Sequence, residues 1–413
     1  MRQESHLYSH DIIESASQLM SQYFQKKIHF SQVVQISESD RRNLILRLLV
    51  DNPTDNMPQS LILKQSATEK NVFDAQAPAE SEIEQLSRFA HDWAGLELLT
   101  EIDSNHAPHF YGGNVEHKFI LIEDLGREHP SLVGPLTKKT SLINLNEAEQ
   151  ALMSYVGRLG QMHADTAGKY SQFTAILNRI YPHALRFNTL PETEITYFIN
   201  QLKRLINIET IQLTKEIYDV MEFSQNPHEF SVLLHGDICL DNVYYQDKEI
   251  KLIDFEWSDF GNALIDGTYL RMSMPSCWCS KSVPVDIVQR MEFIYREELK
   301  KGIVTAGNDP VYYKQLTYAC AYWLIRTLKQ LDAMNLLENE WTCPSGPVDM
   351  ESQWDPNKNA FRPRVLSRLD AFISCSNITG HLPKLCKAAT QLLNYLKKAW
   401  PETPFIDVFP VFK

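Results

Sequence analysis

The spacing of apolar side chains along the first 125 residues predicts two helices and five short strands. Residues 10–26 and 80–101 repeat apolar side chains every three or four positions, which is the period of a helix with one buried face. Segments rich in Val, Ile and Leu predict strands, because these side chains suit a pleated, half-buried surface. Asp51-Asn52-Pro53 marks a turn, so the first three strands should form an antiparallel meander. The predicted strands are 28–36, 43–50, 60–66, 109–112 and 118–123.

After Gly126 helical spacing dominates. Residues 127–142 contain two prolines and predict irregular chain, and the apolar tail 404–412 is expected to pack onto the rest. The predicted helices are 146–167, 170–181, 192–204, 208–225, 283–301, 311–335, 361–374 and 381–399, and one island of strands at 231–235, 243–246 and 250–254 interrupts them. This order predicts an α+β chain with two lobes. A small antiparallel-sheet lobe spans 1–124, and a larger, mainly helical lobe spans 125–413.

Polar residues follow the strands of the island in a pattern that suits phosphoryl transfer. His235-Gly236-Asp237 comes directly after an apolar run, and Asn242 follows five positions after the aspartate. Asp254-Phe255-Glu256 closes the next apolar run, so a short hairpin returns Asp254 toward Asn242. An amide oxygen and a carboxylate suit a hard cation such as Mg²⁺. A further carboxylate can orient or deprotonate an attacking hydroxyl, which is the other requirement of this chemistry.

These residues resemble the signature of the aminoglycoside phosphotransferase and choline kinase-like family, H-G-D-x-x-x-x-N followed by I-D-[FW]-E. The resemblance implies a two-lobed protein-kinase-like fold. It also implies Mg-ATP-dependent phosphorylation of a hydroxyl on a small molecule: a metabolite, an amino alcohol or an aminoglycoside-like antibiotic. By the same resemblance Asp237 is the catalytic base, and Asn242 and Asp254 bind Mg²⁺. Gly261 and Asp266 also match the family, and Asp266 is expected to be structural.

Lys64 ends an apolar strand that resembles the V-A-I-K strand of kinases, which implies contact with the α and β phosphates of ATP. Such a lysine needs an acidic partner on the helix 80–101. The segment Phe89–Leu96 resembles the family's F-x-N-E-W-A-G-L, with Asp92 at the position of the family's glutamate. Asp92 is therefore the preferred partner. Other acidic residues of the same helix stay open as alternatives; they are Glu82, Glu84 and Glu97.

Two further segments bear on nucleotide binding. Residues 120–126 resemble the family's hinge, which implies that adenine bonds to the carbonyl of Glu123 and the amide of Leu125. The first glycine of the chain is Gly95, so the loop 37–43 cannot be a glycine-rich phosphate loop. Two interpretations of this loop stay open. Either its hydroxyls, amides and arginines contact phosphate, or the loop is a solvated turn. His163, in another family-like segment, is expected to be a structural residue.

Composition excludes several classes of protein. The net charge of −12 argues against a broad nucleic-acid or acidic-membrane surface. The chain shows no signal-peptide pattern and no apolar stretch of membrane-spanning length, so we expect a cytoplasmic protein without a membrane partner. Seven scattered cysteines predict no disulfide framework. The segment Cys277-Trp278-Cys279 could bind a soft metal, but the preferred interpretation is that its cysteines are buried or lie in a lid. Cys239 lies in the predicted catalytic loop and is a candidate oxidant-sensitive thiol.

Alternatives to a small-molecule kinase follow from the departures. The glycine-free loop and Asp92 suggest a pseudokinase-like binding or scaffold protein. A protein kinase is disfavoured because no Ala-Pro-Glu segment follows Asp254. Asp241, Glu256 and Asp259 suggest an acidic wall for a cationic acceptor. The less favoured interpretation is that these carboxylates cap turns or bind metal. The acceptor, the choice between ATP and GTP, and the oligomeric state stay open.

Overall fold

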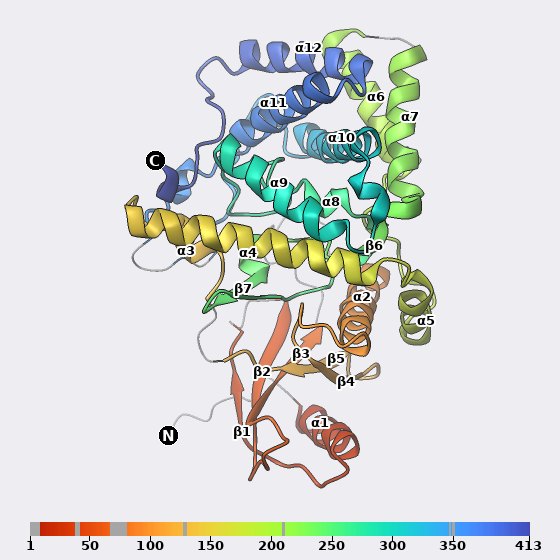
Figure 1. The fold of residues 1–413 in the computed structure, drawn as a ribbon, viewed down its shortest axis with the longest axis vertical. Coiled ribbons are helices and arrows are strands. Elements are labelled where there is room, and N and C mark those ends of the chain that lie inside the picture. The colour runs from red at the N-terminus through yellow and green to blue at the C-terminus, as the bar shows by residue number, and fades with distance from the viewer. Residues whose placement is uncertain are drawn as a thin grey trace. The chain divides into compact units, whose positions relative to one another are not determined.

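The computed structural model describes residues 9–37, 42–66, 81–126, 130–208, 211–346, 348 and 352–413. They belong to two compact units (Figure 1). The first unit combines residues 1–129 with two later segments, 171–185 and 253–256, and the second unit holds the rest of the chain. The division into lobes at 124/125 stays a prediction. No helix among the described residues combines the length and the apolarity that crossing a membrane requires.

A five-stranded antiparallel sheet in the order β1-β2-β3-β5-β4 forms the centre of the first unit, so the predicted meander is confirmed. Period-2 alternation places Leu61 and Leu63 of β3 on one face, and Ile62 and Lys64 on the other. The strands are β1 (Phe30–Gln35), β2 (Asn43–Val50), β3 (Ser60–Ser66), β4 (Phe110–Asn114) and β5 (Phe119–Glu123).

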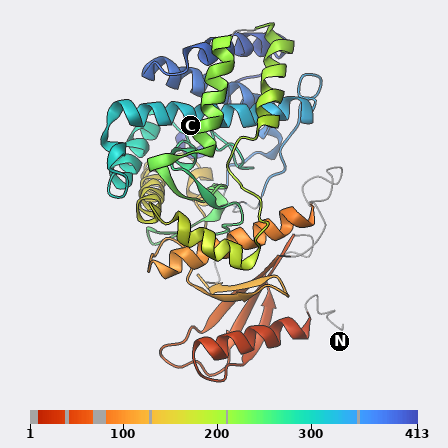
Figure 2. The same cartoon turned by 90° about the vertical axis from the view of Figure 1, so that its right-hand side faces the viewer.

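Two helices cover opposite faces of this sheet (Figure 2). Helix α1 (His10–Tyr23) buries Ile12, Ala16 and Met20 in the core that Leu61 and Leu63 also line. Helix α2 (Glu82–Glu101) lies over the other face, where Lys64 projects, and a capping box at Ser81 starts it. Most of α5 (Tyr170–Ile180) also belongs to the first unit. The face of the sheet with Leu61 and Leu63 therefore contributes to the core with α1, and the face with Lys64 meets α2.

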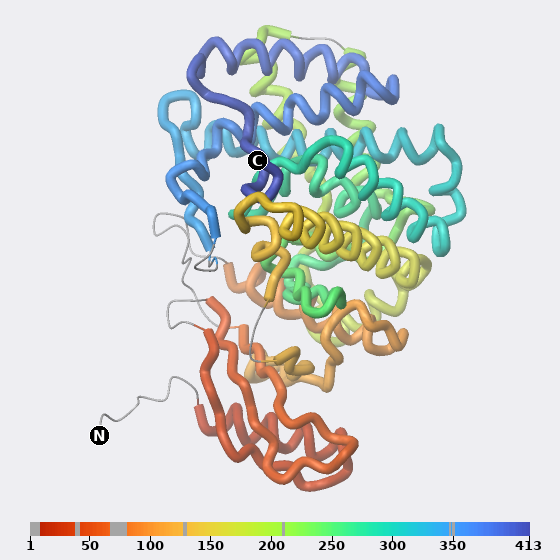
Figure 3. Tube along the Cα trace, turned by 60° about the vertical axis from the view of Figure 1, so that its left-hand side comes forward, coloured from red at the N-terminus to blue at the C-terminus, as the bar shows by residue number. Residues whose placement is uncertain are grey.

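The second unit is mainly helical. Helix α4 packs along α9, and α10, α11 and α12 pack in succession (Figure 3). The helices are α3 (Val133–Thr137), α4 (Leu142–Thr166), α6 (Glu192–Ile206), α7 (Ile211–Gln225), α8 (Leu264–Gly267), α9 (Val285–Leu299), α10 (Asp309–Ala333), α11 (Phe361–Thr379) and α12 (Pro383–Ala399). The predicted packing of the tail is confirmed, because Val408 pairs with Ser282 and Phe409 is buried.

The prediction that the strands of the second unit form one island is wrong, because they form two separate pairs. Strand β6 (Ser231–Leu234) pairs with β9 (Asp259–Asn262), whereas β7 (Val243–Gln246) pairs separately with β8 (Glu249–Leu252). All four residues of β9 are buried, but Asp-Phe-Gly-Asn carries neither an apolar run nor an alternation. These four residues form a strand because they pair with β6, and no pattern in their own sequence indicates that pairing. Helix α3 also lies in a stretch predicted to be irregular.

Candidate active site

The buried Lys64 pairs with a buried and a partly exposed carboxylate in the first unit. The Nζ atom of Lys64 lies 2.7 Å from Oδ2 of Asp92 and pairs also with Asp254. A second bond holds the cluster, because Oδ1 of Asp92 accepts from the amide of Phe255 at 2.9 Å. The expected pairing of Lys64 with Asp92 is therefore present. Two of the alternatives are engaged elsewhere, since the Glu84 carboxylate accepts from the amide of Ser81 and Glu97 bonds Trp93 and Arg179.

The charges of this cluster shift one another's pKa values. Burial alone would lower the pKa of the Lys64 ammonium, but the charges of Asp254 and Asp92 outweigh it and raise that pKa. Burial raises the pKa of the Asp92 carboxyl to about 6, against the opposing effect of Lys64. Burial acts in the same direction on Asp254, but the charge and hydrogen bond of Lys64 lower the pKa of its carboxyl overall. Lys64 and Asp254 are therefore charged at neutral pH.

Glu256 is held between two arginines. Arg42 donates to its Oε2, and Arg88 of α2 donates to its Oε1. Only 8% of Glu256 is exposed. The carboxylate is therefore neutralised inside the first unit, and it is not the acidic substrate wall that the sequence suggested. Ser37, from the same loop as Arg42, is also engaged, because its hydroxyl accepts from the amide of Ile45 at 3.0 Å. Residues 38–41 of this loop, including Arg41, lie outside the described residues.

A bidentate ion pair fixes the hinge segment. Arg47 donates to Asp124 through Nε at 2.6 Å and through a terminal nitrogen at 3.0 Å. Ser60 and the amide of Gly126 bond the same carboxylate. Burial alone would raise the pKa of Asp124, but these hydrogen bonds lower it. Glu123 and Leu125 flank this anchored residue, so the chain that carries them is held in one conformation.

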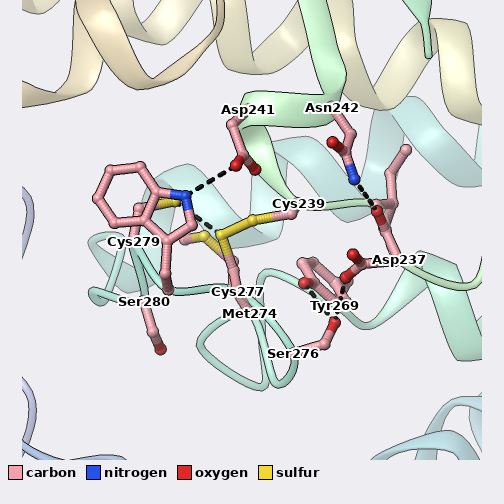
Figure 4. Close-up of a disulfide and its surroundings, with 12 residues drawn as sticks. Asp237, Cys239, Asp241, Asn242, Tyr269, Met274, Ser276, Cys277, Cys279 and Ser280 are labelled. Atoms are coloured by element: carbon pink, nitrogen blue, oxygen red, sulfur yellow. Dashed lines mark hydrogen bonds between the residues drawn. A yellow bond between two sulfur atoms is a disulfide. The ribbon is translucent and has the colours of Figure 1, made fainter. Parts of the chain in front are cut away.

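The predicted catalytic loop lies in the second unit, directly after β6. Asn242 ends a short 3-10 turn, and its Nδ2 atom donates to the carbonyl of Asp237 at 3.0 Å (Figure 4). This bond uses the amide nitrogen of Asn242, and the Oδ1 atom is the acceptor of the same side chain. Asn242 precedes the first residue of β7, and Asp254 follows the last residue of β8 by two positions. The hairpin thus begins and ends at the two predicted metal ligands.

The loop starts on a buried anchor. The amide of His235 donates to Asp266 at 2.7 Å, and Nε2 of His163 lies 3.6 Å from the same carboxylate. Both Asp266 and His163 are buried, so their expected structural roles fit this geometry. Gly236 has a positive φ of 78°, and a Cβ atom there would collide with the carbonyl of Trp257. The loop therefore requires glycine at this position.

The side chain of Asp237 has a partner that the sequence did not predict. Ser276 donates its hydroxyl to Oδ1 of Asp237 at 2.6 Å, and Tyr269 bonds Ser276 at 2.8 Å. Neighbouring acidic residues are engaged as well. Asp241 accepts from the indole of Trp278 at 2.7 Å, and Asp259 is buried and paired with Arg186 at 3.0 Å. These contacts do not favour a free acidic wall around the catalytic loop.

Three cysteines lie beside this loop (Figure 4). Cys239 and Cys277 form a disulfide across 38 positions of sequence, and the Sγ atom of Cys279 lies 2.7 Å from that of Cys277. All three are buried. Scattered cysteines had predicted no disulfide framework, and this pair departs from that expectation because the fold joins two loops that are distant in sequence. The prediction that Cys277 and Cys279 are buried is confirmed.

Comparison with known proteins gives the family of this chain. The ecdysteroid kinase-like family matches residues 18–300, more than half of the chain. The chain belongs to this family. The predicted kinase-like family and the α+β protein-kinase-like fold are therefore confirmed. No curated protein matches the chain.

Several solved structures are similar to this chain at low identity. Amicoumacin kinase hAmiN, solved with AMP-PNP, Ca²⁺ and Ami, is 14% identical, with 96% of this chain and 98% of that chain covered and a TM-score of 0.43. Choline kinase from Cryptosporidium parvum Iowa II is 13% identical, with 90% of each chain covered and a TM-score of 0.41. Choline kinase LicA from Streptococcus pneumoniae is 12% identical, with 87% and 99% covered and a TM-score of 0.39.

Proposed function

We propose that this chain transfers a phosphoryl group from Mg-ATP to a hydroxyl of a small molecule. The observation that carries the proposal is the pairing of the buried Lys64 with Asp92 and Asp254. A buried lysine held by two carboxylates is costly to fold, so such clusters mark functional sites more often than stable cores. Phosphoryl transfer asks for this kind of positioned charge.

In the proposed reaction Lys64 binds the α and β phosphates, and Asp92 orients its ammonium group. Glu123 and Leu125 offer a backbone carbonyl and amide to the adenine, on a segment that Arg47 and Asp124 make rigid. Neither adenine contact selects against guanine through a side chain, so ATP and GTP both belong in the assay.

Asn242 and Asp254 offer an amide oxygen and a carboxylate, a donor set that fits Mg²⁺. About a third of the Asp254 side chain is exposed, so the carboxylate is accessible as well as charged. Bound there, Mg²⁺ would neutralise phosphate charge. Asp237 then accepts the proton of the acceptor hydroxyl, a task that suits its half-buried position in the loop.

The test measures ADP release from Mg-ATP with a panel of hydroxyl acceptors. The family name puts ecdysteroids in the panel, beside amino alcohols and aminoglycosides. Asp237→Ala should lose several orders of magnitude in turnover while Mg-ATP still raises its melting temperature, because nucleotide binding lies elsewhere. Asp247→Asn, an exposed aspartate in the β7–β8 turn, is the matched control.

Normal ADP release by Asp237→Ala in the presence of an acceptor would contradict the assignment. Stabilisation by nucleotide without turnover across the panel would favour the pseudokinase-like binding protein instead.

A further inference from the structure

The disulfide Cys239–Cys277 joins the two segments that meet at Asp237. Cys239 lies two positions after Asp237 in the catalytic loop, and Cys277 directly follows Ser276. Ser276 is the residue whose hydroxyl bonds the Asp237 carboxylate. The covalent link and the hydrogen bond therefore connect the same two short stretches of chain, within a few residues of each other (Figure 4).

The contact between Ser276 and Asp237 places a protein hydroxyl where the proposed reaction needs an acceptor hydroxyl. The Oγ atom of Ser276 lies 2.6 Å from Oδ1 of Asp237, a short charge-assisted hydrogen bond. Ser276 therefore competes with an acceptor hydroxyl for this oxygen. Ser276 is itself exposed, so burial in a core does not explain its position.

The segment around Ser276 is held on its other side by α11. Arg364 donates to the carbonyls of Cys277 and Trp278 at 2.9 and 2.8 Å. Arg368 donates to the carbonyls of Met272 and Met274. Because these contacts lie on both sides of Ser276, the disulfide fastens the catalytic loop to a stretch that is already anchored. The disulfide therefore limits how far the backbone at Asp237 can move away from the backbone at Ser276.

We propose that Cys239 and Cys277 form a redox-sensitive latch that keeps Ser276 on the Asp237 carboxylate and lowers phosphotransferase turnover. This inference rests on the proposed function. A dithiol reductant opens the latch. One of its thiolates attacks a sulfur of the disulfide, the sulfur–sulfur bond breaks, and the second thiolate closes the reductant's own disulfide. Cys239 and Cys277 are each left as a protonated thiol, and two electrons have passed from the dithiol to the protein.

A third cysteine, Cys279, lies beside the proposed latch but takes no part in its opening. Its sulfur lies in the same buried cluster, with the ligand atoms of Cys239, Cys277 and Cys279 within 4.8 Å of one another. Burial raises the pKa of the Cys279 thiol, so this third sulfur stays protonated and does not attack the disulfide. Three reduced cysteines could alternatively bind a soft metal, and the experiment includes that outcome.

The experiment uses the full chain equilibrated with oxidised or reduced dithiothreitol. Peptide mass spectrometry after alkylation should find Cys239 linked to Cys277 only in the oxidised sample. Basal ADP release from Mg-ATP, with water as the acceptor, should be several-fold faster in the reduced form. Ser276→Ala should be fast in both forms. Cys239→Ser combined with Cys277→Ser should match reduced wild type, and Cys343→Ser, outside the cluster, should keep the response.

Three results would overturn the latch: free Cys239 and Cys277 in the oxidised sample, equal ADP release by the two redox forms, or slower release by Ser276→Ala. Zinc or copper bound to the three reduced cysteines at one ion per chain would replace it with a metal site. The rise in melting temperature with Mg-ATP distinguishes failure of the proposed function from failure of the latch. If neither redox form is stabilised, the proposed function fails, and the mass spectrometry still decides whether the disulfide forms and opens.

Discussion

The Nζ atom of Lys64 lies 2.7 Å from Oδ2 of Asp92 in the interior of the first unit. Aspartate stands here where related kinases were expected to have glutamate, and its side chain is one methylene shorter. The structure accommodates the shorter side chain, because Asp92 still reaches the lysine and also accepts from the amide of Phe255. The substitution therefore does not by itself indicate a defective nucleotide site.

Lys64→Met should reduce the stabilisation by Mg-ATP. We expect affinity for Mg-ATP to fall about ten- to a hundred-fold, because the charge-assisted bonds from the lysine to phosphate are lost. The melting temperature of the free protein should fall as well, since Asp92 would be buried without its counter-ion. Thermal shift with and without Mg-ATP measures both effects. Lys27→Met, on an exposed lysine of the same unit, should change neither.

Asp92→Asn should affect stability in a pH-dependent way. Burial raises the pKa of Asp92 to about 6, from an ordinary value of 3.8, so between these values the folded chain binds a proton that the unfolded chain does not. The stability from this carboxyl is present below the lower value and is lost as pH rises through about 6. Asparagine does not titrate, so the melting temperature of the variant relative to wild type should rise from about pH 5 to about pH 7.5.

Asp103→Asn, on an exposed aspartate of the first unit, is the control for this titration and should show no such trend. A difference in melting temperature between Asp92→Asn and wild type that stays constant with pH would show that the pKa of the Asp92 carboxyl is not raised.

Gly236→Ala should destabilise the second unit more than Gly168→Ala. Both glycines have a positive φ, 78° and 76°, so alanine is strained by about 1 kcal/mol at either position. Only at Gly236 would the new Cβ also collide with backbone, at the carbonyl of Trp257, whereas nothing lies within 4 Å at Gly168. We expect an additional loss of about 2 kcal/mol for Gly236→Ala. Denaturant unfolding of the two variants side by side measures it, and equal losses would refute the contact.

Arg88→Met should destabilise the first unit by roughly 3 kcal/mol, because it removes a partner of the buried Glu256 carboxylate. Arg179→Met is the comparison, since Arg179 is 59% exposed in its pair with Glu97 and should contribute about 0.5 kcal/mol. Thermal unfolding of both variants decides it. Similar losses would mean that Arg42 alone neutralises Glu256.

The sequence predicted most elements and the positions of the site residues because these depend on local patterns. Lys64 could be placed on the sheet face away from the core from strand alternation alone, and the structure has it there. The loop from His235 to Asn242 could be recognised because its spacing is short and fixed. The assigned roles of these residues stay predictions.

Contacts between distant residues were not predictable in the same way. The pairing of Arg42 and Arg88 with Glu256 joins residues more than 160 positions apart, and nothing in the local sequence of any of them indicates the others. The same holds for Ser276 on Asp237 and for the disulfide. Strand β9 was missed for a related reason, since its state depends on β6 and not on its own four residues.

The segment 253–256 belongs to the first unit although the chain on both sides of it belongs to the second. A fragment of residues 1–129 would lack Asp254 and Glu256, and would leave Arg42 and Arg88 without the carboxylate that pairs with them. We therefore expect that truncation to residues 1–129 does not yield a stable first unit. Recombination that replaced only the N-terminal part of the gene would combine Lys64 from one parent with Asp254 from another. Both parts of the site therefore have to be inherited together.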